Sequence, residues 1–335
     1  MDRVLDALND TNRVILSTHL NADGDGTGCQ VAMASWLRSR GKEAWIVNPT
    51  PFPRPYAFLL PDAEWSHDPG SQRAKELARN ADLALVLDTG ETSRIGRVNK
   101  LVRELPKVVV DHHPPGPDPI DGVSFRDPSA SATGELVYDL LLAAGGPVSR
   151  EAALGLYVAI LTDTGSFRFS NASPGAHRVV ADLLELGVDP EETHRRVYGQ
   201  VPERKLRLLQ ASLDTLTVDD EAGVAWMTVP TPAYKDLSAT SDDIEGFVDY
   251  PRMVEGMEVG LLFRETARGQ TKVSFRANGT VDMNELARRF GGGGHVKAAG
   301  AVVEAPLAGA REQVLEATRE AVEKTVGEGE EGKGR

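Results

Sequence analysis

Four short motifs place histidine and aspartate side chains at the ends of apolar segments. They are HLNADGDG with His19, Asp23 and Asp25; DTG with Asp88; DHH with Asp111, His112 and His113; and TDTG with Asp163. The DHH motif follows the β-branched run 107–110, which is typical of a buried strand. Three titratable groups are costly to place beside a core unless they have partners. We therefore expect these groups to take part in chemistry.

The motifs point to a shared metal centre. Asp88 or Asp163 alone would be explained equally well as a helix cap. In a parallel sheet, however, loops at the carboxyl ends of the strands converge on one crevice. Five carboxylates gathered there would repel one another, and two divalent cations would neutralise them. Histidine and aspartate ligation without thiolate favours Mn²⁺, while Mg²⁺, Co²⁺ and Zn²⁺ also suit it. A two-cation centre is the standard device for hydrolysing phosphate esters.

The segment 19–28 has a second interpretation. Its G-x-G-x-G spacing faintly resembles a dinucleotide-binding loop. Two aspartates in such a loop would repel a phosphate, so we favour the metal centre. We expect a polar, glycine-rich loop over 19–28, with Asp23 and Asp25 pointing the same way, followed by a helix over 29–40.

A fifth motif, RRFGGGGHVKAAG, covers residues 288–300 and contains Gly292, Gly293, Gly294 and His295. A glycine run lets backbone amides approach an anion, and Arg276 could add a bidentate phosphate contact. The alternative is a flexible loop. Residues 252–300 contain eight basic and five acidic side chains. This small basic region in a chain of net charge −13 suits a short anionic ligand better than a long, double-stranded nucleic acid.

The elements that must position these motifs alternate between strand and helix. Strands are expected at 12–18, 43–48, 82–87 and 107–110, and helices at 1–10, 29–40, 71–80, 94–105, 133–144, 149–162, 175–186 and 190–198. This alternation predicts an α/β fold with a doubly wound, mainly parallel sheet. Residues 199–215 suggest a helical linker.

A smaller α+β domain is expected over 216–324. Its strands are expected at 224–229, 258–264 and 271–277, and its helices at 241–254, 282–289 and 307–324. The Gly/Glu-rich segment 325–335 is predicted to be a disordered tail. The first domain then spans 1–198.

The composition agrees with a globular protein of two domains. The chain has 335 residues, 41% of them hydrophobic, and a single cysteine, Cys29. One cysteine excludes an intrachain disulfide and favours the cytoplasm. No apolar run approaches the ~18 residues of a membrane span, so no membrane partner is expected.

Together these motifs resemble the DHH/DHHA1 phosphoesterase family, of the bacterial oligoribonuclease (nanoRNase) and pAp phosphatase type. Asp111-His112-His113 carries the DHH resemblance, with His19, Asp23, Asp25, Asp88 and Asp163. GGGGH…AAG and the VSFR ending at Arg276 carry the DHHA1 resemblance, and the match extends over 1–324. Gly26 and Thr27 replace more usual family residues, but neither is a ligand.

The resemblance implies a role for each group. His19, Asp23 and Asp88 would hold one cation; Asp25, Asp88, His112 and Asp163 would hold the other. His113 would face the scissile phosphate, and Asp111 would orient a histidine. Arg276, Gly292, Gly293, Gly294 and His295 would bind the rest of the substrate, with the active site in the cleft between the domains.

The resemblance implies Mn²⁺-dependent hydrolysis of short RNA oligonucleotides to mononucleotides and of 3′-phosphoadenosine 5′-phosphate (pAp) to AMP. Four alternatives stay open: a pApA or c-di-AMP phosphodiesterase, a pyrophosphatase, a single-strand DNA exonuclease, and a non-catalytic nucleotide-binding module. A homodimer is compatible with the resemblance.

Overall fold

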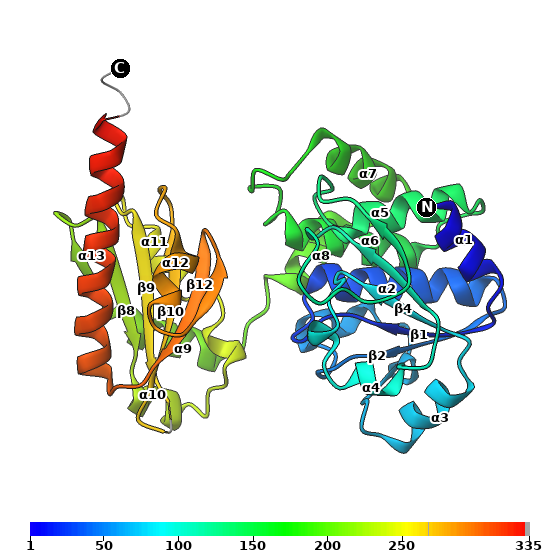
Figure 1. The fold of residues 1–335 in the computed structure, drawn as a ribbon, viewed down its shortest axis with the longest axis horizontal. Coiled ribbons are helices and arrows are strands. Elements are labelled where there is room, and N and C mark those ends of the chain that lie inside the picture. Colours follow the sequence, from blue (N-terminus) through cyan, green and yellow to red (C-terminus); the bar gives the residue numbers. More distant parts are fainter. Residues whose placement is uncertain (267, 332–335) are drawn as a thin grey trace. The chain divides into compact units, whose positions relative to one another are not determined.

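The chain folds into two compact units, Met1–Gln200 and Val201–Arg335. The computed structural model describes residues 1–266 and 268–331 (Figure 1). Each unit has its own six-stranded sheet. No helix in the described residues is long and apolar enough to cross a membrane.

The first unit is built on a fully parallel sheet with strand order β3-β2-β1-β4-β5-β6. Its strands are β1 Arg13–Ser17, β2 Glu43–Val47, β3 Ser66–His67, β4 Leu83–Leu87, β5 Lys107–Asp111 and β6 Val123–Arg126. The chain order reverses between β1 and β4. In doubly wound folds, ligands bind at such a switch point, beyond the carboxyl ends of the strands.

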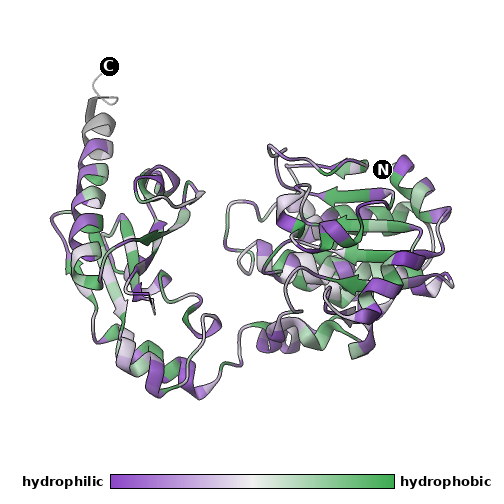
Figure 2. Cartoon of the chain, turned by 60° about the horizontal axis from the view of Figure 1, so that its bottom comes forward, coloured by the Kyte–Doolittle hydropathy of each residue, from purple (hydrophilic) through white to green (hydrophobic). Residues whose placement is uncertain are grey.

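Helices cover both faces of this sheet. They are α1 Asp2–Asn9, α2 Gly24–Ser39, α3 Gln72–Asn80, α4 Val98–Leu101, α5 Thr133–Ala143, α6 Arg150–Asp163, α7 Pro174–Glu185 and α8 Pro190–Val197. In β1, Val14 and Leu16 join the core under α2, α5 and α6, whereas Ile15 joins the core under α3 and α4. Strands buried on both faces are continuously apolar, and Figure 2 shows them as hydrophobic. The predicted doubly wound fold is confirmed.

The expected glycine-rich loop at 19–28 is wrong over its second half, because α2 already begins at Gly24. Asp23 caps this helix by accepting a hydrogen bond from the Gly26 amide at 3.0 Å. The glycines allow close packing: a Cβ atom on Gly28 would lie 2.1 Å from the carbonyl oxygen of Gly155 in α6. Asp23 therefore stands before the helix and Asp25 inside it.

The second unit is an α+β fold with strand order β11-β12-β10-β9-β8-β7. Its strands are β7 Thr217–Asp219, β8 Val224–Val229, β9 Val259–Glu265, β10 Thr271–Ala277, β11 Gly293–His295 and β12 Ala298–Val303. Only β8 and β9 pair in parallel. The helices are α9 Glu203–Leu213, α10 Thr231–Asp236, α11 Asp249–Arg252, α12 Met283–Arg288 and α13 Leu307–Glu331.

Several elements differ from the sequence prediction. The helix expected at 94–105 is a 3₁₀ turn, Ser93–Ile95, followed by the short α4. The helix expected at 241–254 is likewise a 3₁₀ turn, Asp242–Ile244, followed by α11. Helix α13 continues to Glu331, into the segment predicted to be disordered from residue 325. The rest of that segment, 332–335, lies outside the described residues.

Candidate metal centre

The four motifs meet at the carboxyl edge of the first sheet. His19 follows β1, Asp88 follows β4, and Asp111 ends β5. Asp163 is the last residue of α6, and Asp25 lies in the first turn of α2. The glycine contact between α2 and α6 lets these two helices approach closely.

The first group consists of His19, Asp23 and Asp88, whose ligand atoms lie within 4.8 Å of one another. His19 Nε2 is 3.2 Å from Asp88 Oδ2 and 3.6 Å from Asp23 Oδ2. His19 Nδ1 lies 2.8 Å from the Leu20 carbonyl oxygen, which accepts a hydrogen bond from it. Burial lowers the pKa of His19, but the two carboxylates outweigh burial and raise that pKa to about 10.

The second group consists of Asp25, His112 and Asp163. His112 Nε2 is 3.4 Å from Asp163 Oδ2 and 3.8 Å from Asp25 Oδ2. His112 Nδ1 donates to the Ala130 carbonyl oxygen at 3.2 Å. Burial raises the pKa of Asp163 to about 6, and it raises the pKa of the fully buried Asp25 as well, with the charge of Asp88 adding to both shifts.

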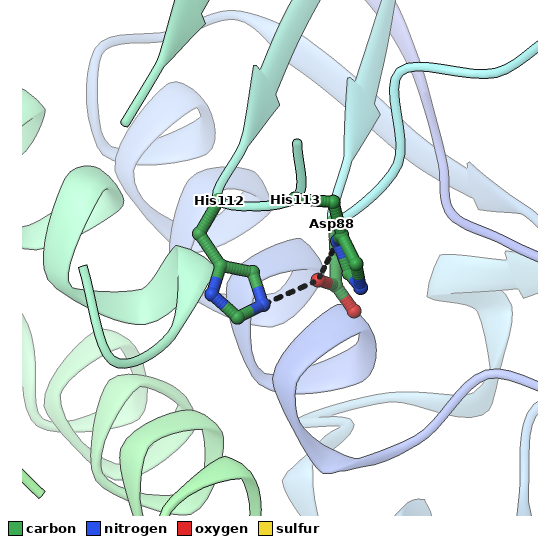
Figure 3. A group of neighbouring side chains, drawn as sticks. All are labelled: Asp88, His112 and His113. Atoms are coloured by element: carbon green, nitrogen blue, oxygen red, sulfur yellow. Dashed lines mark ion pairs between the residues drawn. The ribbon is translucent and has the colours of Figure 1, made fainter. Parts of the chain in front are cut away.

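Asp88 joins the two groups. Its Oδ2 faces His19, while its Oδ1 is 3.7 Å from His112 Nε2 and 3.6 Å from His113 Nδ1 (Figure 3). Its side chain is buried, and its backbone has a φ of 61°. Left-handed backbone is uncommon in residues other than glycine and is least unfavourable for Asn and Asp.

His113 has a different set of partners. Its Nδ1 donates to Asp111 Oδ1 at 2.8 Å, and the same oxygen accepts a hydrogen bond from the His113 backbone amide. Asp111 Oδ2 is 3.2 Å from Arg126 Nη2. Burial lowers the pKa of His113, but the bond to Asp111 reverses this effect and raises it. Within the described residues, no protein group is hydrogen-bonded to His113 Nε2.

These side chains fit divalent cations. Asp88 and Asp25 are buried, and the pKa values of Asp25 and Asp163 are raised first by burial and then by the charges of neighbouring carboxylates, both of which a divalent cation would offset. His19 and His112 each engage Nδ1 with a backbone carbonyl and turn Nε2 towards carboxylates. Second-shell hydrogen bonds of this kind orient the histidine ligands of metals.

In the second unit, two of the predicted phosphate-binding residues lie in one row. Arg276 of β10 and His295 of β11 both pair with Ala298 of β12. Residues directly opposite on neighbouring strands face the same side of a sheet, so Arg276 and His295 share a face, with backbones about 10 Å apart.

Most of the glycine run lies in a hairpin at the edge of the second sheet. The alternative that we considered for this run, a flexible loop, did not predict a hairpin. A Cβ atom on Gly292 would lie 2.2 Å from the Gly300 carbonyl oxygen, and one on Gly294 would lie 2.5 Å from that of Ala298. Gly293 begins β11. These glycines therefore permit close pairing of β11 and β12.

Sequence reasoning missed three residues whose side chains contact side chains of the centre. Thr133 donates from its backbone to Asp25 and from its hydroxyl to Asp88. Arg126 pairs with Asp111, and Cys29 Sγ lies 3.3 Å from Asp25 Oδ1. Strand β6, which carries Arg126, was itself not predicted. The position of Thr133 at the start of an expected helix was the one available signal.

Comparisons with known proteins agree with this architecture. The DHH family, N-terminal domain, matches residues 13–160, and the DHHA1 domain matches residues 224–328. The bifunctional oligoribonuclease and PAP phosphatase NrnA of Thermus thermophilus is 36% identical over 310 residues, covering 92% of this chain and 89% of that protein. The protein of the same name from Bacillus subtilis is 27% identical over 296 residues, covering 87% and 89%.

A solved structure extends the agreement to three dimensions. An exopolyphosphatase-related protein from Bacteroides fragilis superposes with a TM-score of 0.87 at 25% identity, covering 97% of this chain and 96% of that one. The fold and the motifs thus define a two-domain α/β protein. The chain belongs to the DHH family and joins a DHH domain to a DHHA1 domain. The family resemblance inferred from the motifs is confirmed.

Proposed function

We propose that this chain is a phosphoester hydrolase that degrades short oligoribonucleotides to mononucleotides and converts pAp to AMP. The observation that carries the proposal is Asp88, whose two oxygens face two adjoining groups of histidine and aspartate side chains. The similarity to the Thermus and Bacillus proteins, both named bifunctional oligoribonuclease and PAP phosphatase, supports the substrate class.

His19, Asp23 and Asp88 would hold one divalent cation, and Asp25, Asp88, His112 and Asp163 the other. Mn²⁺ suits this mixed set of ligands best. When bound, such cations polarise a phosphoryl oxygen and lower the pKa of water. The Nε2 atoms of His19 and His112 face the carboxylates and would coordinate the cations, because each Nδ1 already donates to a carbonyl oxygen. A bound cation would take the place of the proton at Nε2.

His113 would act on the substrate. Asp111 holds a proton at His113 Nδ1 and raises the pKa of this imidazole above its usual value, which favours the protonated form. Its Nε2–H can then donate to a phosphoryl oxygen and transfer a proton to the leaving oxygen. Arg276 and His295, on one face of the second sheet, would bind a second phosphate of the substrate.

The test measures turnover of a substrate panel in Mn²⁺: pAp, pApA, di- to pentaribonucleotides, single-stranded DNA and pyrophosphate. We expect pAp and the short oligoribonucleotides to be cleaved. Asp88→Asn should lose at least about 100-fold in turnover, since loss of a partner that only orients a ligand already costs 10–100-fold. Asparagine tolerates the left-handed backbone at this position, so the variant should fold.

Asp121→Asn is the matched control, because Asp121 is an exposed aspartate in the same unit. It should retain full activity. If pAp and a labelled dinucleotide both stay intact, the substrate assignment is wrong. Preferential cleavage of pApA, pyrophosphate or DNA would replace it with the corresponding alternative. If Asp88→Asn remains fully active, the proposed centre itself is wrong.

A further inference from the structure

Thr133, the first residue of α5, contacts both groups of the proposed centre. Its backbone amide donates to Asp25 Oδ2 at 2.7 Å, and its hydroxyl donates to Asp88 Oδ1 at 3.1 Å. The next amide, that of Gly134, donates to Asp25 Oδ1 at 2.9 Å. Thr133, Asp25 and Asp88 are all buried, with at most 1% exposed.

The Thr133 hydroxyl can fix the orientation of the Asp88 carboxylate. Asp88 has left-handed backbone, and its carboxylate lies between His19 and His112. A carboxylate rotates readily about its terminal torsion unless hydrogen bonds fix its plane. Within the described residues, the Thr133 hydroxyl is the one non-histidine side chain hydrogen-bonded to Asp88. Because threonine is β-branched, its own χ1 is restricted.

The start of α5 has a separate anchor. The Ser131 amide donates to Glu135 Oε1 at 2.8 Å, and the Ser131 hydroxyl bonds the same oxygen. The two hydrogen bonds to Asp25 come from the backbone amides of Thr133 and Gly134, so a change of side chain at 133 removes neither donor. The position of the helix therefore does not depend on the Thr133 hydroxyl, and the hydroxyl can be removed selectively.

We propose that Thr133 is a positioning residue: its hydroxyl sets the plane of the Asp88 carboxylate so that one oxygen faces each cation group. This inference rests on the proposed function, because it assumes that the two groups hold divalent cations. It gives α5, which carries none of the four aspartate and histidine motifs, a role in orienting a metal ligand.

The test compares Thr133→Val with Thr133→Ser. Valine keeps the shape and loses the hydroxyl, whereas serine keeps the hydroxyl and loses the methyl group. Isothermal titration with Mn²⁺ should show that Thr133→Val binds cations about 10–100-fold more weakly than wild type, as is typical when a partner that orients a ligand is lost. Thr133→Ser should restore affinity close to that of wild type. At saturating Mn²⁺, Thr133→Val should lower kcat for pAp and leave KM nearly unchanged.

Thr193→Val is the matched control. Thr193 is a buried threonine in α8 of the same unit, and its hydroxyl donates to the carbonyl oxygen of Asp189, the residue before this helix. This variant should bind Mn²⁺ like wild type, which separates the effect at residue 133 from a general effect of removing a buried hydroxyl.

Each outcome has a distinct meaning. Wild-type Mn²⁺ affinity in Thr133→Val would overturn the role of Thr133 alone. Equal loss in Thr133→Val and Thr133→Ser would also overturn it, because packing rather than the hydroxyl would then be responsible. If the wild-type protein binds no Mn²⁺, the proposed cation centre fails and this inference fails with it. If it binds Mn²⁺ but cleaves none of the panel, only the proposed substrates are wrong.

Discussion

At the residue scale, the three histidines of the site are distinguished by their hydrogen-bonding partners. His19 and His112 engage Nδ1 with backbone carbonyls and direct Nε2 to carboxylates, whereas His113 engages Nδ1 with Asp111. At His19 and His112 the carboxylates lie beside Nε2, where a cation would take the place of the proton, whereas at His113 the carboxylate holds a proton at Nδ1 and leaves Nε2 for the substrate. This difference supports separate roles, with two histidines as ligands and one as a proton donor.

Arg126 gives a prediction at this scale. Arg126→Met should lower kcat for pAp about 10-fold, because Asp111 would lose its cationic partner and hold His113 less firmly. Mn²⁺ affinity should hardly change, since Asp111 belongs to neither cation group. Steady-state kinetics and Mn²⁺ titration on the same preparation measure both quantities.

Two further variants complete this experiment. Arg126→Lys should recover part of the lost kcat, because the positive charge returns without the guanidinium geometry. Arg97→Met removes an arginine from an exposed pair with Asp68 and should have no effect on kcat. Parallel loss of Mn²⁺ binding and turnover in Arg126→Met would show that Arg126 supports the whole centre rather than His113.

At the element scale, the crossing of α2 and α6 sets the distance between Asp25 and Asp163. Gly28 and Gly155 face each other there: a Cβ atom on Gly155 would lie 2.5 Å from the Gly28 carbonyl oxygen. Backbone on both sides leaves no flexible side chain to move aside. A methyl group at either position must separate the two helices.

Gly155→Ala should therefore destabilise the protein by about 1–3 kcal/mol, the usual range for overpacking. It should also weaken Mn²⁺ binding, because Asp25 and Asp163 move apart. Urea denaturation and Mn²⁺ titration measure the two effects.

Gly309→Ala in α13 is the control for this prediction, because the nearest atom to an added Cβ there is 3.9 Å away. Alanine favours helix over glycine by up to ~1 kcal/mol, so this variant should be neutral or stabilised. If Gly155→Ala behaved like Gly309→Ala, the helices would have room that the structure does not show.

The elements also show what the sequence could predict. The buried strands β1, β2, β4 and β5 were predictable because strands covered on both faces are continuously apolar. The first turns of α2 were not, because glycine at 24, 26 and 28 is unfavourable in a helix unless close packing compensates. That packing involves α6, more than 120 residues further along the chain. Strand β6 is short and half-buried, so it lacked a clear pattern.

The site was predictable to a similar degree. Its aspartate and histidine residues could be found from the sequence because each follows an apolar segment. Thr133 and Arg126 could not, since a single threonine or arginine has no chemical signature until its neighbours in space are known. The grouping of the carboxylates was implied by the family resemblance, but the residue pattern alone placed Asp23 and Asp25 together in one loop, whereas Asp25 lies in the first turn of α2.

At the scale of the whole molecule, acidic groups packed in one centre link stability to pH. The pKa of Asp163 is raised to about 6, so the metal-free native state binds more protons than the unfolded state between pH ~4 and 6. The contribution of Asp163 to the free energy of unfolding therefore falls as pH rises from ~4 to 6. His19, with its pKa raised to about 10, contributes stability that is lost as pH rises from ~6.5 through 10.

Divalent cations should reverse this loss of stability with rising pH. The side chains that bind a metal must be deprotonated, so cation binding strengthens as pH rises. A cation that binds only the native state stabilises that state. We expect saturating Mn²⁺ to raise the Tm of the full chain more at pH 8 than at pH 5.5, measured by differential scanning fluorimetry. Asp88→Asn should show a much smaller Mn²⁺ effect at both pH values. An equal Mn²⁺ effect at both pH values in the wild-type protein would contradict the linkage.

The long-range bond between Thr133 and Asp25 has a consequence for protein synthesis. It spans 108 residues, and Asp163 emerges later still. At ribosomal speeds of about 5–20 residues per second, Asp163 is synthesised roughly 7–29 s after His19 and Asp23. The group of Asp25, His112 and Asp163 therefore cannot hold a cation until α6 has been synthesised, whereas the group of His19, Asp23 and Asp88 has all its members much earlier. The second cation can bind only after α6 has packed against α2, so its acquisition follows the closing of the α2–α6 crossing by apolar packing.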